Sequence, residues 1–343
     1  MVDGGPGTVG RHHLDSRPLR AGPSRRPPLT RIADALDRFL LPLVVLAAAV
    51  GIAWPGPGRN LDAGNAILVT LAVLVFCTGA SMTFRDLAGL RTASRRLVLV
   101  LAVSTVALPA FAWLASHLVS GAALRGGVLA AGVAPAEVAS VALTGLAGGE
   151  AAMAAGLLAA STVVTVLLAG PVLSLLGAHA TTSQLGLLAI LALVVALPLL
   201  AGAALRTLDP LGGRERSPLR VIGTLSLLVL LWEVASELHL QASDARMVAA
   251  LLLYLACGAG LGWLLGRGVP PARGTAILLP TAMRDFAVAA GIAASAFGPP
   301  AAAPLGIYGI LVLAFGAVAA AVIRRRQPGP ARASGSPERP GPR

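Results

Sequence analysis

Long apolar runs recur along the chain and are separated by short polar connectors. Most of these runs contain roughly 20 residues, the length of α-helix needed to cross about 30 Å of hydrocarbon. Connectors such as Pro55-Gly56-Pro57-Gly58 are rich in proline and glycine, which is typical of turns. We therefore predict ten membrane-spanning helices, at 39–54, 63–83, 97–118, 126–148, 151–176, 185–205, 219–238, 247–266, 274–297 and 302–323.

Two of the predicted spans contain proline beside charged residues. Pro135 precedes Glu137 in the fourth span, and Pro280 precedes Arg284 and Asp285 in the ninth. Proline removes a backbone donor, and backbone groups freed at membrane depth must be satisfied by protein, water or a bound solute. We therefore predict that Pro135 and Pro280 break helices four and nine.

Ten spans divide into two halves of five, at about 39–176 and 185–323. Because five is odd, a repeated second half is inverted relative to the first, as in many secondary transporters. The two broken spans occupy corresponding positions in these halves. The expected fold is an all-α polytopic membrane protein with two inverted five-helix repeats, in which the broken helices four and nine cross.

Composition and charge agree with a membrane protein. The 343 residues are 56% hydrophobic and only 12% charged, too little charge to cover a soluble domain of this length. The formal net charge of +12 comes from arginines between the apolar runs and in the tails. No basic face interleaved with aromatic residues exists, so we expect the lipid bilayer, and no nucleic acid, as a partner.

The two ends of the chain differ from the transmembrane domain expected at 37–326. Residues 1–36 and 327–343 lack a periodic apolar pattern and are predicted to be disordered, apart from a short amphipathic piece from Ile32 to Phe39. Arginines gather in the tails and in every second connector, while the opposite connectors hold only Arg59, Arg125 and Arg246. The positive-inside rule then predicts that both termini are cytoplasmic and that the protein lies in the cytoplasmic membrane.

Glu137, Arg284 and Asp285 are charged residues within apolar spans. A charge at the bilayer centre costs roughly 2.5–3.5 kcal/mol, and such residues face a cavity, pair with one another or perform chemistry. We interpret these residues as part of a substrate or ion site. An alternative, compatible with that site, is an internal ion pair between Arg284 and Glu137 that joins the two helices.

Other polar residues within the spans have two readings. Ser161 and Thr162 either bond to the preceding turn of their helix or line the site. The sequence contains no metal-ligand spacing, phosphate-binding glycine loop or nucleophile–base pair, and no connector is long enough for a nucleotide-binding domain. We therefore expect no enzymatic activity, no catalytic or metal-binding residues and no cofactor, and a coupling ion, Na⁺ or H⁺, remains open.

The fourth, fifth and ninth spans resemble the bile acid:sodium symporter family. The resemblance rests on Ala134 to Pro171, APAEVASVALTGLAGGEAAMAAGLLAASTVVTVLLAGP, and on Thr281 to Ala290, TAMRDFAVAA. Phe297-Gly298-Pro299 and Ile307-Tyr308-Gly309 also fit. The resemblance implies ten helices in two inverted repeats, unwound and crossing spans four and nine, and a panel domain that moves against a core domain. It implies organic-anion substrates such as bile acids, steroid sulfates, pantothenate-like acids and keto acids.

Several positions depart from the residues that the family uses to bind sodium. Ser140 matches a family serine, but Val141 stands where the family has asparagine. The other departures are Ala154 and Leu158 in place of serine and threonine, Pro280 in place of glutamate, Arg284 and Asp285 in place of glutamine and asparagine, and Ser104 near the position of a glutamine. Glu137 is the candidate replacement carboxylate, either binding a cation or titrating a proton, and Arg284 either balances it or holds an anionic substrate.

These observations predict a secondary transporter that moves a small organic anion by alternating access. The predicted substrate- and ion-binding residues are Glu137, Ser140, Thr144, Thr281, Met283, Arg284 and Asp285. The alternatives are a sodium-independent uniporter or exporter, and a membrane ligand sensor that does not transport. The sequence leaves the substrate, the direction of transport and the oligomeric state open.

Overall fold

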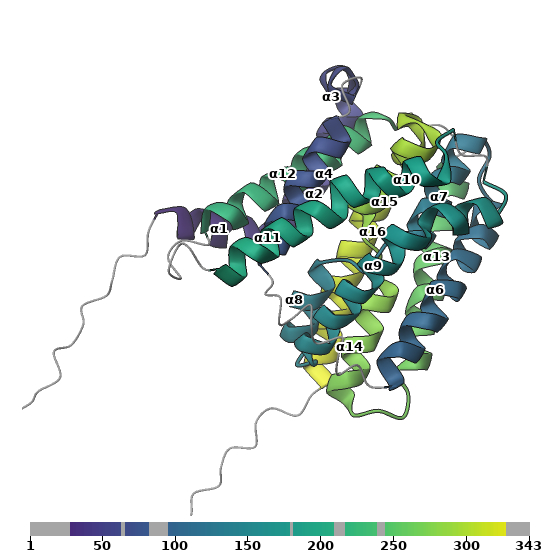
Figure 1. The fold of residues 1–343 in the computed structure, drawn as a ribbon. Helices are drawn as coiled ribbons and strands as arrows, with labels where there is room; N and C mark the ends of the chain where they lie inside the picture. The colour runs from purple at the N-terminus through teal and green to yellow at the C-terminus, as the bar shows by residue number, and fades with distance from the viewer. Residues whose placement is uncertain are drawn as a thin grey trace, which may run out of the picture.

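The computed structural model describes residues 28–62, 66–81, 95–178, 181–208, 217–238 and 244–326. Throughout these residues the regular elements are helices, and each of the ten predicted spans coincides with a helix or with a helix broken in two (Figure 1). Within the same residues, six helices are long and apolar enough to cross a membrane. The prediction of an all-α polytopic membrane protein is confirmed.

The helices form two groups that lie side by side in Figure 1. The first group contains α2 (Leu40–Ala53), α4 (Ala66–Gly79), α11 (Leu197–Leu208) and α12 (Ser217–Ser236). The second contains α6 (Arg95–Ser116), α7 (Ala122–Val133), α8 (Ala139–Leu146), α9 (Ala151–Leu175), α13 (Asp244–Leu265), α14 (Pro271–Ala282), α15 (Phe286–Phe297) and α16 (Ala303–Arg326). α10 (Gln184–Leu191) continues into α11 through the π-helical turn η2 (Ala192–Ala196), and the 3₁₀ turn η3 (Pro299–Ala302) precedes α16.

The fourth and ninth spans are each broken into two helices, and the breaks cross. The segment between α7 and α8 lies antiparallel to the segment between α14 and α15. The Glu137 N–H donates to the Met283 carbonyl at 2.9 Å, and the Asp285 N–H donates to the Pro135 carbonyl at 2.9 Å. Backbone groups freed at one break are therefore satisfied by the other, as a low-dielectric setting requires.

The two prolines occupy different places relative to the breaks. Pro135 lies within the break of the fourth span, as predicted, whereas Pro280 lies inside α14, which continues to Ala282. The new helix begins after Asp285, whose side chain caps the first turn of α15. The cap therefore sets the position of the second break, and the prediction that helix nine breaks at Pro280 itself was wrong by three residues.

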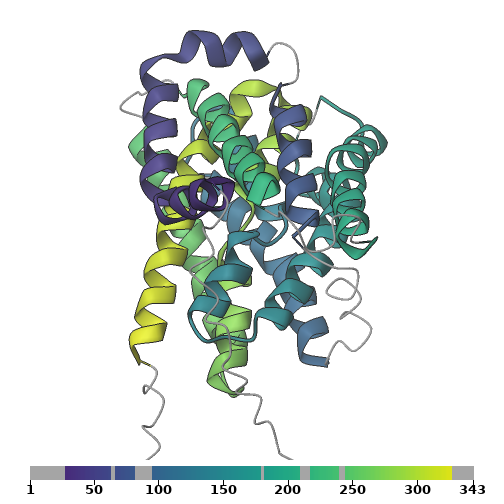
Figure 2. The ribbon, with the colours of Figure 1, turned by 90° about the vertical axis from the view of Figure 1, so that its left-hand side faces the viewer.

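Two short helices correct the sequence-based prediction. α1 (Pro28–Arg38) contains residues expected in a disordered tail up to residue 36, and it includes most of the amphipathic piece predicted from Ile32. α3 (Pro55–Asp62) replaces the turn expected at Pro55-Gly56-Pro57-Gly58, and Figure 2 shows it lying across one end of the molecule. Both helices begin with proline, which suits the first turn because no backbone donor is needed there. The predicted tail segments 1–27 and 327–343 lie outside the described residues.

α4 and α11 pack with their backbones in close approach at two glycines. A Cβ atom on Gly202 would overlap the Phe76 carbonyl oxygen, and one on Gly79 would overlap the Leu199 carbonyl oxygen. Small residues at such a crossing allow membrane helices to pack tightly. The two helices are therefore tightly packed against each other within the first group.

Gly202→Ala is expected to destabilise the protein by about 2 kcal/mol, because the added methyl group must push α4 away from α11. Gly260→Ala is the matched control, since a Cβ atom on this exposed helical glycine meets nothing within 4 Å. Thermal unfolding of both variants in detergent measures the difference. Equal unfolding temperatures would contradict the close packing of α4 on α11.

Candidate functional site

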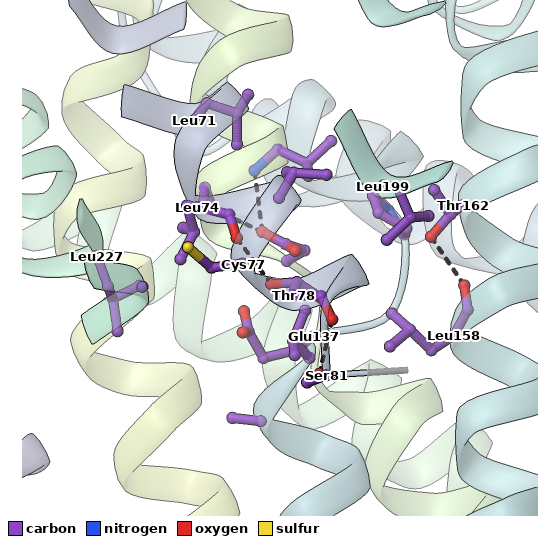
Figure 3. Close-up of a pocket in the computed structure, with 18 of the residues that line it drawn as sticks. Leu71, Leu74, Cys77, Thr78, Ser81, Glu137, Leu158, Thr162, Leu199 and Leu227 are labelled. Atoms are coloured by element: carbon purple, nitrogen blue, oxygen red, sulfur yellow. Dashed lines mark hydrogen bonds between the residues drawn. The ribbon is translucent and has the colours of Figure 1, made fainter. Parts of the chain in front are cut away.

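A cavity of about 360 Å³ lies between the two helix groups, next to the crossing of the broken spans. Its walls come from α4, α11 and α12 on one side and from α8, α9 and α15 on the other. Figure 3 shows the apolar lining, including Leu71, Leu74, Leu199 and Leu227. Hydroxyl groups of Thr78, Ser81, Thr162 and Thr224 also line it, and its charged lining residues are Glu137, Asp285 and Arg220.

Glu137 and Asp285 line this cavity, and they lie at the N-terminal ends of α8 and α15. The Asp285 Oδ1 atom accepts hydrogen bonds from the N–H groups of Ala287 and Val288, both at 2.9 Å. The Glu137 carboxylate lies close to the N–H groups at the start of α8 and to the N–H of Phe286. Helix N-termini favour negative charge, which explains how two carboxylates are accommodated at this depth.

The two carboxylates are also close enough to repel each other. Both residues are only 6% exposed, and the Oε2 atom of Glu137 is buried without a hydrogen-bond partner among the described residues. An unsatisfied buried acceptor is unfavourable, and a second negative charge beside it adds to the cost. The arrangement is therefore suited to a proton or another cation.

Arg284 points away from these carboxylates. It lines a separate cavity of about 20 Å³ between α6, α7 and α9, together with Ser104 and Ser161. Its guanidinium group donates to the carbonyl of Ala134, at the C-terminal end of α7, where the helix macrodipole favours a cation. The charges at the crossing are thus sorted by helix polarity, with carboxylates at N-termini and the guanidinium at a C-terminus.

The expected ion pair between Arg284 and Glu137 is not formed. In the described part of the chain, Arg284 makes no salt bridge within 4.0 Å to Glu137 or Asp285, and one of its nitrogens, Nε, has no hydrogen-bond partner. Met283 and Asp285 have extended backbone conformations, and successive side chains of an extended segment point to opposite faces. The break therefore separates Arg284 from the cavity that Asp285 lines.

The remaining predicted site residues lie near the crossing but do not line the large cavity. Ser140 and Thr144 lie one turn apart on α8, and among the described residues neither buried hydroxyl oxygen has a partner. Thr281 is buried in the last turn of α14, and Met283 packs close to Gly316 of α16. Roles for these four residues in binding stay predictions.

Side chains from neighbouring helices form hydrogen bonds with backbone groups at the break between α7 and α8. Ser161 accepts a hydrogen bond from the Ala136 N–H at 3.0 Å and donates to the Leu158 carbonyl at 2.9 Å. The last carbonyls of α7 are also satisfied, because Thr165 donates to Val133 at 2.8 Å and Tyr254 donates to Ala131 at 3.0 Å. Thr162 bonds to the preceding turn of α9 and also lines the large cavity, whereas Ser161 bonds to the preceding turn and lines the small cavity beside Arg284.

Sequence reasoning missed the cavity residues that come from the first helix group. Cys77, Thr78 and Ser81 on and after α4, and Arg220 on α12, were not predicted as site residues. Their helices carry no mid-span charge and no proline-linked break, so no local pattern marks the face toward the cavity. Arg220 stands at the very start of the predicted seventh span, 219–238, where a basic residue is ordinary.

The broken, crossing spans and the cavity beside them define a polytopic membrane protein with a central small-molecule cavity. Residues 68–283 match the family model described as Sodium Bile acid symporter family, and the chain belongs to this family. The chain is similar to a protein of Arabidopsis thaliana described as Probable sodium/metabolite cotransporter BASS1, chloroplastic. The two are 28% identical over 308 residues, which cover 87% of this chain and 76% of that relative.

The family resemblance predicted from spans four, five and nine is thereby confirmed. Family membership supports an integral membrane protein that transports a small molecule within a lipid environment, and it points to a transporter rather than an enzyme.

Proposed function

We propose that this protein is a secondary transporter that moves a small organic anion across the cytoplasmic membrane by alternating access, with both termini in the cytoplasm. A coupling cation, H⁺ or Na⁺, binds at Glu137 and Asp285. The observation that carries this proposal is a pair of buried carboxylates, each at a helix start, facing one cavity between two helix groups. The relative's description as a sodium/metabolite cotransporter supports coupling to a cation.

The cavity suits a small amphipathic solute. Ligand sites commonly have volumes of about 300–1,000 Å³ and mostly apolar walls with a few polar groups, and this cavity has such a lining. Two negative charges at its inner end repel an anion until a cation neutralises them. Binding of the cation before the anion would couple the movement of the two.

Alternating access requires the two helix groups to change their relative position around the site. The broken spans α7–α8 and α14–α15 occupy equivalent places in the proposed repeats, at about 39–176 and 185–323. Inverted repeats of this kind allow one half of a transporter to adopt the conformation of the other. The cavity between the groups would then open alternately to the two sides of the membrane.

Uptake into proteoliposomes tests this function. Pyruvate, pantothenate and taurocholate represent the substrate classes, each measured with an inward pH gradient, an inward Na⁺ gradient and neither gradient. Saturable accumulation that depends on one cation gradient is expected. Equal uptake without a gradient would favour a uniporter, and saturable binding without uptake would favour a ligand sensor.

A further inference from the structure

α1 is amphipathic, and its apolar face is largely exposed. Leu29, Ile32, Leu36 and Phe39 follow one another at spacings of three and four residues, which places them in one stripe along the helix and the turn after it. Ile32 and Phe39 are 48% and 53% exposed, and Leu29 is exposed as well. A contiguous stripe of large, exposed apolar side chains indicates an interaction surface.

α1 lies across the end of the first membrane-spanning helix. Its axis is bent by 74° from that of α2, and it packs mainly against α12 (Figure 2). Just beyond the bend, α2 exposes Leu41, Val45 and Leu46, as expected for a helix side that faces lipid. A helix that is nearly perpendicular to a membrane-spanning helix runs along the membrane surface, so the stripe on α1 lies where the lipid headgroups meet the acyl chains.

The charges of α1 exclude a position deeper in the hydrocarbon. Arg31, Asp34, Asp37 and Arg38 all lie among its 11 residues, and charged side chains are costly at the bilayer centre. Amphipathic helices with this pattern instead sink about 5–10 Å into the boundary between headgroups and acyl chains. α2 has 14 residues, a length of about 21 Å, which is less than the hydrocarbon thickness of about 30 Å. An immersed α1 covers part of the difference.

Basic residues on and before α1 favour a negatively charged membrane surface. Arg25 and Arg26 directly precede the helix, and Arg31 and Arg38 lie on the side of the helix away from the apolar stripe. These four arginines outnumber the two aspartates of α1. The Arg38 guanidinium lies 5.7 Å from the centroid of the Phe39 ring, so a positive charge and an apolar ring meet at the bend. Such a pair suits the interface, where arginine reaches the headgroups and an apolar ring contacts the acyl chains.

We propose that α1 is an interfacial anchor that binds the anionic lipid surface of the cytoplasmic leaflet. Its apolar stripe lies among the first acyl-chain carbons, and Arg31 and Arg38 contact the lipid phosphates. The cytoplasmic leaflet carries a negative surface potential that attracts basic segments. The proposal goes beyond the transport function and shares with it only the cytoplasmic N-terminus. Because α1 packs against α12, which lines the large cavity, the anchor fixes the depth of one cavity wall in the membrane.

Spin labelling of the full-length protein tests the immersion of α1. Cys77→Ala and Cys257→Ala remove the two native cysteines, and single cysteines at positions 29–39 then carry a nitroxide in turn. The protein is reconstituted into phospholipid bilayers. Collision rates are measured with oxygen, which concentrates in hydrocarbon, and with the nickel complex NiEDDA, which stays in water.

The two reagents are expected to give opposite patterns along α1. Oxygen collisions should peak at Leu29, Ile32 and Leu36, and NiEDDA collisions should peak at Arg31 and Arg38. The oxygen-to-NiEDDA ratio at Ile32 should exceed that at Arg31, its matched control one residue away, severalfold. Coinciding maxima of the two reagents would show that α1 lies in water and would overturn the proposal. High oxygen and low NiEDDA collisions at every position would place α1 inside the hydrocarbon and would overturn it as well.

Lipid charge tests the recognition of anionic headgroups. Adding phosphatidylglycerol to phosphatidylcholine bilayers should raise the oxygen-to-NiEDDA ratio at a label on Ile32→Cys. Arg31→Gln with Arg38→Gln should remove this response, because each arginine near an anionic surface changes the binding equilibrium by about fivefold. Arg125→Gln with Arg246→Gln is the matched control, since both arginines are predicted at the opposite surface and donate to Val119 and Ser120 there.

The response to lipid charge separates this proposal from its alternatives. An equal ratio with and without phosphatidylglycerol in the parent protein would contradict the binding of anionic lipid, and so would an undiminished response in Arg31→Gln with Arg38→Gln. Collision rates require no transport, so a failure to move any tested anion would leave the anchor in place. Cation-driven uptake by a protein whose α1 remains in water would contradict the anchor alone.

Discussion

Glu137→Gln is expected to abolish uptake driven by a cation gradient. The substitution keeps the size of the side chain and removes the charge that faces the cavity beside Asp285. Truncating one partner of a buried charge interaction commonly costs 2 kcal/mol or more, so cation affinity should fall by about 30-fold or more. Uptake in proteoliposomes with and without the coupling gradient measures this loss, and the remaining uptake should no longer respond to the gradient.

Glu150→Gln is the control for this experiment. Glu150 lies before α9, pairs with Arg273 at 3.1 Å and is 44% exposed, so its charge is solvated and remote from the cavity lining. Its substitution should leave gradient-driven uptake unchanged. If Glu137→Gln also retains full, gradient-dependent uptake, Glu137 has no role in coupling.

The positions of the spans were predictable because each apolar run is long and its ends are marked by polar residues. The break at Pro135 was predictable because proline and a nearby charged residue interrupt an otherwise apolar run. α3 was missed because Pro55 and Gly56 favour turns locally, although proline also suits the first turn of a helix. Because Pro55 suits both a turn and the start of a helix, only its packing in the folded chain decides which of the two forms.

The candidate site was predictable only in part. Glu137 and Asp285 stand out because a charge in an apolar span requires a reason, and both line the cavity. The direction of Arg284 was not predictable, since it depends on the extended backbone of the break rather than on helical spacing. Cys77 and Arg220 reach the cavity through the packing of α4 and α12, which no local pattern encodes.

Arg284→Met is expected to destabilise the protein by about 3 kcal/mol or more. The guanidinium group bonds to the buried carbonyl of Ala134 and lies close enough to Asp285 for their charges to attract. Methionine keeps much of the side-chain length but leaves that carbonyl without this donor and removes the positive charge that attracts Asp285. Thermal unfolding in detergent should show a large drop in unfolding temperature.

Arg125→Met is the matched control for the lost hydrogen bond. Arg125 also donates to a backbone carbonyl, that of Val119 at 2.7 Å, but it lies away from the crossing. We expect it to cost about 1 kcal/mol, the contribution of an ordinary hydrogen bond. A similar cost for Arg284→Met would show that the charge of Arg284 contributes nothing.

The double substitution Arg284→Met with Asp285→Asn separates charge from packing. An asparagine oxygen can still accept the hydrogen bonds from Ala287 and Val288 that begin α15. If uncompensated negative charge causes most of the loss, the double variant should unfold at a higher temperature than Arg284→Met alone. If the stability losses of the two substitutions are additive, the crossing depends on the shape of the Arg284 side chain. The placement of carboxylates at helix N-termini and of the guanidinium at a helix C-terminus then contributes little to stability.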